Sequence, residues 1–192
     1  MKTITAKLVT TGLALFALTA TASAQVATTK DALAIALKNE TIAAGGEKMK
    51  LYMISGNYNG ATKRWSFQFF DGGANVHSVS VDGKGKANYY SRDKGSSRVF
   101  EDLDFSELPA PGEVRVEDAV GKAKTALEAL GFKPIDSGKL YISYYVRSEY
   151  RQKDQAVHDF KVTLPTGDGK QGKIVGFKNG VLDTVMNSTI RN

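Results

Sequence analysis

The chain has 192 residues, a formal net charge of +6 and no cysteine. The lack of cysteine excludes disulfides, thiolate metal sites and cysteine nucleophiles. A nucleic-acid partner is not expected either, because it would require basic residues gathered on one face. Here the basic residues alternate with acidic ones, as in Lys122, Lys124 and Glu128.

The first 24 residues have the pattern of a secretory signal peptide. Lys2 and Lys7 give a basic start, residues 8–20 form an apolar run, and Ala22-Ser23-Ala24 forms a small-residue cleavage site before Gln25. The apolar run is too short for a permanent membrane anchor. We therefore expect residues 1–24 to be removed and the mature protein to be periplasmic or secreted. Two of the six net positive charges belong to this segment, which leaves +4 for the mature chain.

A first module is predicted over residues 25–92, and it begins with a helix over residues 28–44. Asp31 would lie in the first turn, where a negative charge suits the helix dipole, and Gly45-Gly46 would end the helix. Four strands are then predicted over residues 51–58, 64–70, 77–81 and 87–91. Strict alternation divides the first strand between two faces, with Leu51, Met53 and Ser55 on one and Tyr52, Ile54 and Gly56 on the other.

Residues 93–113 form the predicted linker, which closes with Pro109-Ala110-Pro111-Gly112. Acidic residues are interspersed among its apolar residues, which are Phe100, Leu103, Phe105 and Leu108. Two interpretations are open. The apolar residues could pack along the seam between modules, or the segment could be an acidic-aromatic strap in a binding groove, since long structured loops are often functional.

The second module, residues 114–192, repeats the order of helix and strands. Apolar residues from Val116 to Leu130 recur every three or four positions, as on one face of a helix that Gly131 ends. Strands are predicted over residues 140–147, 158–164, 174–177 and 181–185, with a hairpin loop at 149–155 and a polar tail that frays after Met186. In the first of these strands Leu140, Ile142, Tyr144 and Val146 share one face, and Tyr141, Ser143, Tyr145 and Arg147 share the other.

Landmarks of the first module recur in the same order about ninety residues later. Lys50-Leu51-Tyr52 returns as Lys139-Leu140-Tyr141, and the turn at Asp82-Gly83 returns as Asn179-Gly180. This period is too long for a solenoid and suits two small domains. The predicted fold class is α+β, with two similar modules that each pack one α-helix on an antiparallel sheet of about four strands.

This order of parts resembles a PepSY domain. In the first module the resemblance is carried by residues 79–85 (Val-Ser-Val-Asp-Gly-Lys-Gly), and in the second by Glu117-Asp118-Ala119 with residues 175–181. The tandem arrangement is similar to PepSY-like proteins grouped with β-lactamase inhibitory proteins, which present paired sheets to a partner. PepSY domains also occur in propeptides of thermolysin-type metallopeptidases. The resemblance implies a non-enzymatic inhibitor or modulator of peptidases, with no catalytic residues to carry over.

No motif in the chain predicts a catalytic, metal or cofactor site. The two histidines, His77 and His158, each continue an apolar strand face, so we expect them to be hydrogen-bonded residues of the core or its rim. The Gly- and Lys-rich turns near Asp82 and Asp168 do not open a helix, as a phosphate-binding loop would. We therefore expect no enzyme, no metal and no cofactor.

The aromatic residues are the remaining candidates for a binding site. Tyr52, Tyr141 and Tyr145 fall on the strand face opposite Leu51, Leu140 and Ile142, and tyrosine is enriched at binding surfaces. The alternative is that the outer faces of the two modules pack together and bury these tyrosines. Arg147 and Trp65 are further candidate anchors, although Trp65, Phe67 and Phe69 together read most simply as core.

These patterns predict an exported protein that binds another protein or peptide, such as an exported peptidase or an envelope protein, on its sheet face. The alternative from a different class is a carrier of a small ligand, held in a pocket between helix and sheet or between the modules.

Overall fold

The computed structural model describes residues 26, 28–59, 62–94, 104–135, 139–148, 156–167 and 171–189. The predicted signal peptide, the hairpin loop at 149–155, and Phe100 and Leu103 of the linker lie outside these residues. No helix of the described ranges is long and apolar enough to span a membrane.

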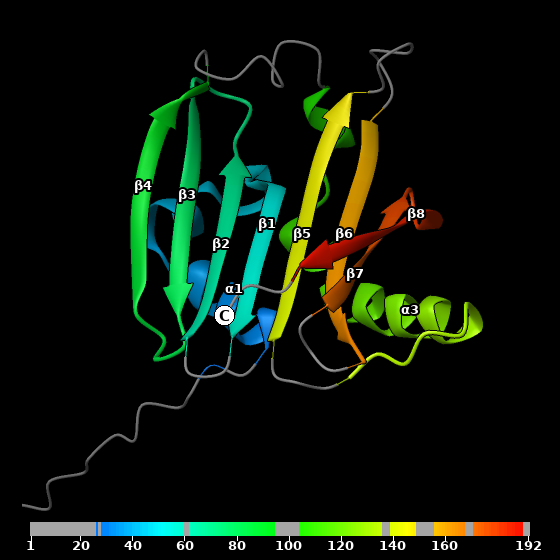
Figure 1. The fold of residues 1–192 in the computed structure, drawn as a ribbon. Coiled ribbons are helices and arrows are strands. Elements are labelled where there is room, and N and C mark those ends of the chain that lie inside the picture. Colours follow the sequence, from blue (N-terminus) through cyan, green and yellow to red (C-terminus); the bar gives the residue numbers. More distant parts are fainter. Residues whose placement is uncertain are drawn as a thin grey trace, which may run out of the picture.

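Eight strands form one antiparallel sheet in the order β4-β3-β2-β1-β5-β6-β7-β8 (Figure 1). The first half contains β1 (Lys50–Asn59), β2 (Thr62–Phe70), β3 (Asn75–Asp82) and β4 (Ala87–Asp93). The second half contains β5 (Lys139–Ser148), β6 (Ala156–Thr166), β7 (Gln171–Lys178) and β8 (Val181–Thr189). β8 therefore continues past Met186, where we expected a frayed tail, because Thr189 still pairs with Gln171 of β7.

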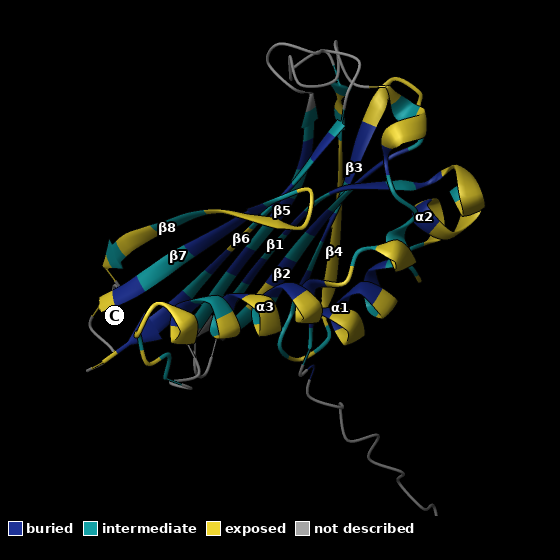
Figure 2. Cartoon of the chain, turned by 90° about the vertical axis from the view of Figure 1, so that its right-hand side faces the viewer, coloured by how far each residue is buried: buried dark blue, intermediate teal, exposed yellow. Residues whose placement is uncertain are grey.

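Three α-helices lie on one face of this twisted sheet: α1 (Thr29–Ala36), α2 (Glu40–Gly45) and α3 (Val116–Ala129) (Figure 2). Thr28 and Asp31 form a capping box at the start of α1. The single helix predicted over residues 28–44 is wrong, because the chain breaks it after Ala36. Asn39 starts a new helix there by accepting the N–H groups of Thr41 and Ile42, a role for which asparagine is well suited.

The α+β class is confirmed, and each half of four strands has a helix of its own. The halves meet edge to edge, since β1 pairs with β5 from Met53–Tyr145 to Asn59–Lys139. Their cores are joined as well. Ile142, Tyr144 and Val146 of β5 pack in the same hydrophobic cluster as Trp65 and the rest of the first half. The two halves thus share one continuous sheet.

A β-bulge between Leu51 and Met53 breaks the alternation of β1. Leu51 lies opposite Phe69 and Ile54 opposite Phe67, so both belong to the helix-covered face. Strict alternation had placed Leu51 and Ile54 on different faces, and this prediction is wrong because the inserted residue shifts the register. Met53 and Ser55 lie on the face without helices.

The described part of the linker packs against the first half of the sheet. Leu108 belongs to the buried cluster, and the ring of Phe105 packs edge-on against Phe70 at 5.6 Å. The N–H group of Leu51 donates a hydrogen bond to the carbonyl of Pro109 at 2.9 Å. These contacts fix the chain between two short 3₁₀ turns, η4 (Phe105–Glu107) and η5 (Pro111–Glu113), just before α3.

Candidate functional site

The face of the sheet opposite the helices, here called the open face, is the first candidate site. Figure 1 looks onto it. On β5 the predicted alternation is confirmed: Ile142, Tyr144 and Val146 are buried in the core on the face that bears the helices. Tyr141, Ser143, Tyr145 and Arg147 are half-buried on the open face. Helix packing on one side therefore directs two of the predicted tyrosines toward the other side.

Tyr145 and Arg147 have charged neighbours on the open face. The ammonium group of Lys161 lies 5.8 Å from the centre of the Tyr145 ring, within the range of a cation–π contact. The Nε group of Arg147 donates to Oδ2 of Asp159 at 2.6 Å, and about a third of the arginine side chain (34 %) remains exposed. Arg147 is thus positioned by a neighbouring strand while part of its guanidinium faces solvent.

Tyr52 and Trp65 are not accessible in the way the sequence suggested. Trp65 has no exposed area and lies opposite Val81, within the core under α1. Tyr52 sits at the bulge of β1 and is 7 % exposed. The pKa of its hydroxyl is raised, mainly because the group is buried; the charge of Arg92 opposes this shift and Tyr145 adds to it. The hypothesis that these two side chains are anchors for a partner is corrected, because neither offers surface to contact.

A hollow of about 840 Å³ opens in the middle of the open face. β1, β2, β5 and β6 supply most of the residues that line it, with Asp82 from β3 and Ile174 from β7, and most of the lining is polar. They include Ser55, Asn57, Arg64, Tyr141, Ser143 and Lys161. Arg64 and Lys161 were not singled out from the sequence, since they come from strands of different halves and only the sheet register brings them to one hollow.

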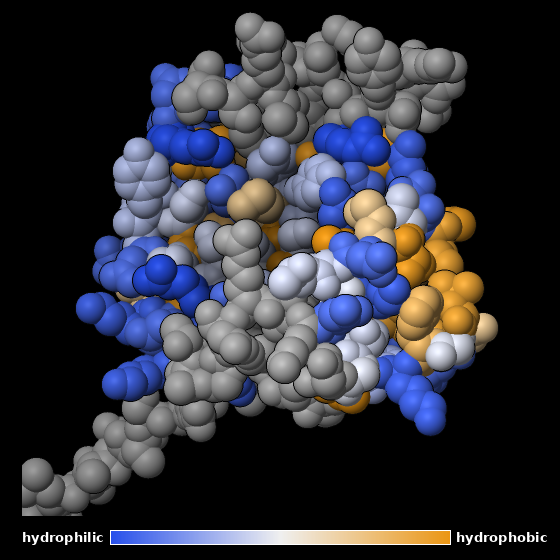
Figure 3. Space-filling model, viewed as in Figure 1, coloured by the Kyte–Doolittle hydropathy of each residue, from blue (hydrophilic) through white to orange (hydrophobic). Residues whose placement is uncertain are grey.

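Apolar residues gather at the β8 end of the open face. Figure 3 shows them on the right, whereas the described residues over β1 to β4 are mainly hydrophilic. Val181, Leu182 and Met186 are exposed on this edge strand. The open face therefore changes from polar to apolar along the direction that crosses the strands.

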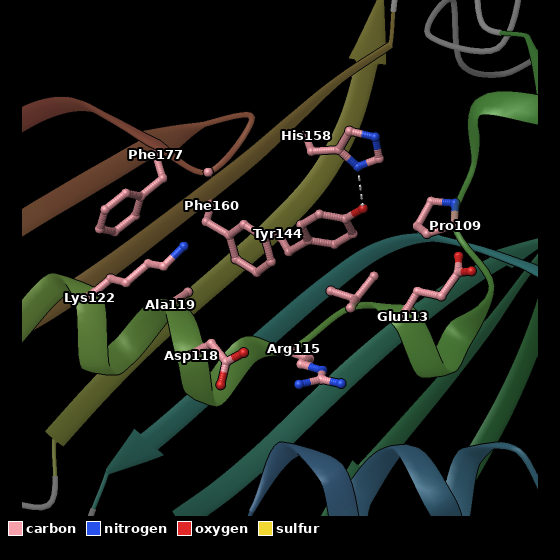
Figure 4. Close-up of a pocket in the computed structure, with 12 residues that line it drawn as sticks. Pro109, Glu113, Arg115, Asp118, Ala119, Lys122, Tyr144, His158, Phe160 and Phe177 are labelled. Carbon is pink, nitrogen blue, oxygen red and sulfur yellow. Dashed lines mark hydrogen bonds between the residues drawn. The ribbon is translucent and has the colours of Figure 1, made fainter.

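The second candidate site is a cavity of about 350 Å³ between the start of α3 and the sheet (Figure 4). Its floor is aromatic, with Tyr144, Phe160 and Phe177 from three neighbouring strands. The centres of the Tyr144 and Phe160 rings are 4.6 Å apart. Charged residues from α3 and the segment before it surround the opening: Glu113, Arg115, Asp118 and Lys122.

A hydrogen bond of 2.9 Å joins the Tyr144 hydroxyl to Nδ1 of His158 at this cavity. Burial raises the pKa of Tyr144, and Glu113 raises it further. Burial lowers the pKa of His158, while Glu107 partly opposes that shift. Both groups are therefore uncharged at neutral pH, which suits the binding of an uncharged ring better than proton transfer from a charged acid.

Both histidines behave as hydrogen-bonded residues, as expected. His77 is buried, and its Nδ1 lies 2.8 Å from the hydroxyl of Tyr89. His158 is half-buried and bonded to Tyr144. Within the described ranges no three histidine or carboxylate side chains converge as a metal site would require.

Comparison with known proteins does not assign a family. No family model matches the chain, and no curated protein matches it. A solved structure with a similar course of the chain is described as a "putative lipoprotein" from Clostridium difficile 630. It has a TM-score of 0.42 and 13 % sequence identity, covering 83 % of this chain and 91 % of that one. Similarity at this level identifies neither a family nor a function.

Proposed function

We propose that the protein is an exported, non-enzymatic binding protein that holds another protein or peptide against the open face of its sheet. The observation that supports this most is the sidedness of β5. Its apolar residues are buried in the hydrophobic core, while Tyr141 and Tyr145 stand partly exposed on the opposite side. Tyrosine provides a large contact area at a low cost in rotamer entropy, so it is well suited to anchor a partner.

The resemblance to PepSY domains supports a partner that is itself exported, such as a peptidase or an envelope protein. The signal-peptide pattern of residues 1–24 supports the same compartment. Intact-mass measurement of the protein recovered from the periplasm and the medium tests this part. A chain that begins at Gln25 is expected, and a cytoplasmic chain that retains Met1 or Lys2 would contradict it.

Alanine substitution at Tyr141 and Tyr145 tests the binding surface. We expect each variant to lose binding to a partner isolated from a periplasmic extract, by about tenfold or more if the tyrosines are hot spots. The melting temperature should change little, because both side chains are half-buried. Leu130→Ala is the matched control, since Leu130 is exposed at the end of α3 on the helix side.

Two outcomes would refute this function. If Tyr141→Ala and Tyr145→Ala bind the partner as well as the unmodified protein, the open face is not the binding surface. If both variants unfold, these tyrosines are structural residues and not anchors.

The aromatic cavity favours a second candidate function, the binding of a small molecule with an uncharged ring. Its volume of about 350 Å³ lies at the lower end of the range for small-molecule sites. Ala119 lines it from α3, so Ala119→Leu would fill the cavity while preserving helix propensity. Native mass spectrometry of the purified protein should reveal a bound small molecule that this variant lacks. If both proteins carry the same amount of bound small molecule, the cavity is not its binding site.

A further inference from the structure

The register of the sheet aligns small polar residues in one row across the open face. Residues directly opposite each other on antiparallel strands share a face. Starting at Ser55 and following the pairs in both directions gives a row that crosses the strands: Ser80, Ser66, Ser55, Ser143, Lys161 and Gly176. Except for Lys161, each of these side chains is short or absent.

Larger side chains stand on both sides of this row. Two residues further along each strand, one flanking row contains Arg64, Asn57 and Tyr141. The other flanking row contains Gln68, Met53 and Tyr145. The low row between two tall ones forms a channel across the strands, here called the serine trough. The hollow of about 840 Å³ lies over the floor and the first flanking row, because Ser55, Ser66 and Ser143 line it together with Arg64, Asn57 and Tyr141.

The dimensions of the serine trough suit an extended chain. Rows two residues apart are separated by about 7 Å, so the two tall rows stand about 14 Å apart. The full width of eight strands is about 34 Å, which an extended polypeptide spans with about ten residues. Serine hydroxyls on the floor can donate to peptide carbonyls and accept from peptide N–H groups.

The charges along the trough favour an acidic occupant. Arg64 and Lys161 form no ion pair with any described residue. Asp159 is already paired with Arg147. Asp82, opposite Arg64, is a carboxylate that lines the same hollow. Its Oδ1 accepts the N–H groups of Lys86 and Lys84 at 2.9 Å each, and these bonds hold the pKa of its carboxyl below the usual value, so it stays ionised. Among the described residues that line the hollow, the three cations Lys63, Arg64 and Lys161 therefore outnumber the carboxylate of Asp82, although Lys161 also lies over the Tyr145 ring.

The spacing of these cations can be worked from the register. Arg64 on β2 and Lys161 on β6 are separated by three strand spacings and one row, or about 16 Å. An extended chain covers that distance in about five residues.

We propose that the serine trough binds an extended acidic segment of the partner, laid across the strands, with one carboxylate at Arg64 and a second, about five residues away, at Lys161. This inference rests on the proposed function of the open face and names the chemistry of the segment that it takes.

Fluorescence anisotropy with labelled synthetic peptides of about ten residues tests it on the mature protein. The probe is a Gly/Ser peptide with two aspartates five positions apart. Comparison peptides replace both aspartates by asparagine or place them side by side. The spaced aspartate peptide should bind most tightly, and its affinity should fall as salt is raised, because exposed charges are screened.

Variants then locate the binding. Arg64→Gln and Lys161→Gln should each weaken binding of the spaced peptide by about two- to fivefold, as expected for exposed ion pairs. Ser143→Leu, which raises the floor of the trough, should weaken all three peptides. Lys124→Gln is the matched control, since it removes a cation of α3 on the helix side that lines neither candidate site, and it should change nothing.

The outcomes separate this inference from the proposed function. Equal binding of the aspartate and asparagine peptides, or binding that survives Arg64→Gln with Lys161→Gln, overturns the acidic segment. The acidic segment is also overturned if no peptide binds but a neutral oligosaccharide does, and Ser143→Leu abolishes binding of that oligosaccharide. The proposed function fails if Tyr141→Ala and Tyr145→Ala leave partner binding intact or if both variants unfold. If no peptide binds at concentrations up to about 1 mM, the trough is not a site for an acidic segment, and the proposed function of the open face is unaffected.

Discussion

The two halves of the chain should unfold as one unit, even though the sequence reads as two modules. Leu127→Ala tests this from the second half. Leu127 has no exposed area and packs from α3 into the second hydrophobic cluster, with Val162 and Val175 of the sheet. The first cluster includes Ile142, Tyr144 and Val146 of β5, so loss of the second half would also expose part of the first core.

The size of the effect follows from burial. Replacing a fully buried leucine by alanine removes apolar contacts and leaves a cavity, which costs about 2–5 kcal/mol. With a denaturant slope of about 3 kcal/mol per molar urea, a loss of about 3 kcal/mol lowers the midpoint of unfolding by about 1 M.

The assay uses Trp65, the single tryptophan of the sequence, which is buried in the first half. Tryptophan fluorescence reports on the first half, and far-UV circular dichroism reports on the whole sheet. In the Leu127→Ala variant both midpoints should fall by the same amount. Glu128→Ala, at the exposed neighbour, is the control and should lie within about 0.5 kcal/mol of the unmodified protein.

A separate response of the two signals would refute this reasoning. If the Trp65 transition stays where it is while part of the dichroism is lost at lower urea, the halves are independent domains. The β1–β5 pairing would then join two sheets without coupling their stability.

Three further predictions follow from single contacts. Because burial lowers the pKa of His158, the folded protein binds fewer protons than the unfolded chain, so stability should fall as pH drops below about 6.5. His158→Gln should flatten this dependence in urea titrations at neutral and acidic pH; an unchanged slope would contradict it. Asn179→Ala should cost about 1–3 kcal/mol, since Asn179 has a φ of 50° and its Oδ1 accepts the N–H of His158 at 2.9 Å; a stable variant would mean that the turn relaxes. Thr28→Ala should cost about 1 kcal/mol by removing the cap of α1, and amide exchange in α1 should rise; unchanged exchange would show that tertiary packing alone holds the helix.

Local sequence patterns predicted which face a side chain occupies wherever the segment forms a regular strand or helix. The alternation of residues 140–147 separated Tyr141 and Tyr145 from Ile142 and Tyr144, because one face of β5 lies in the hydrophobic core and the other does not. Strict alternation failed in residues 51–56, because a β-bulge adds a residue to the strand and no short-range sequence pattern predicts it. Local patterns also missed the break after Ala36, where the side chain of Asn39 caps a second helix.

The sequence by itself determined the repeat, the α+β class and the sidedness of the second half, because these depend on periodicity within short segments. Only the tertiary structure decided that the edges of β1 and β5 pair, which satisfies backbone groups that two separate sheets would leave open. That pairing also decided the serine trough. Ser55 meets Ser143, and Arg64 and Lys161 come to the same hollow, only through hydrogen bonds between strands that are far apart in the chain.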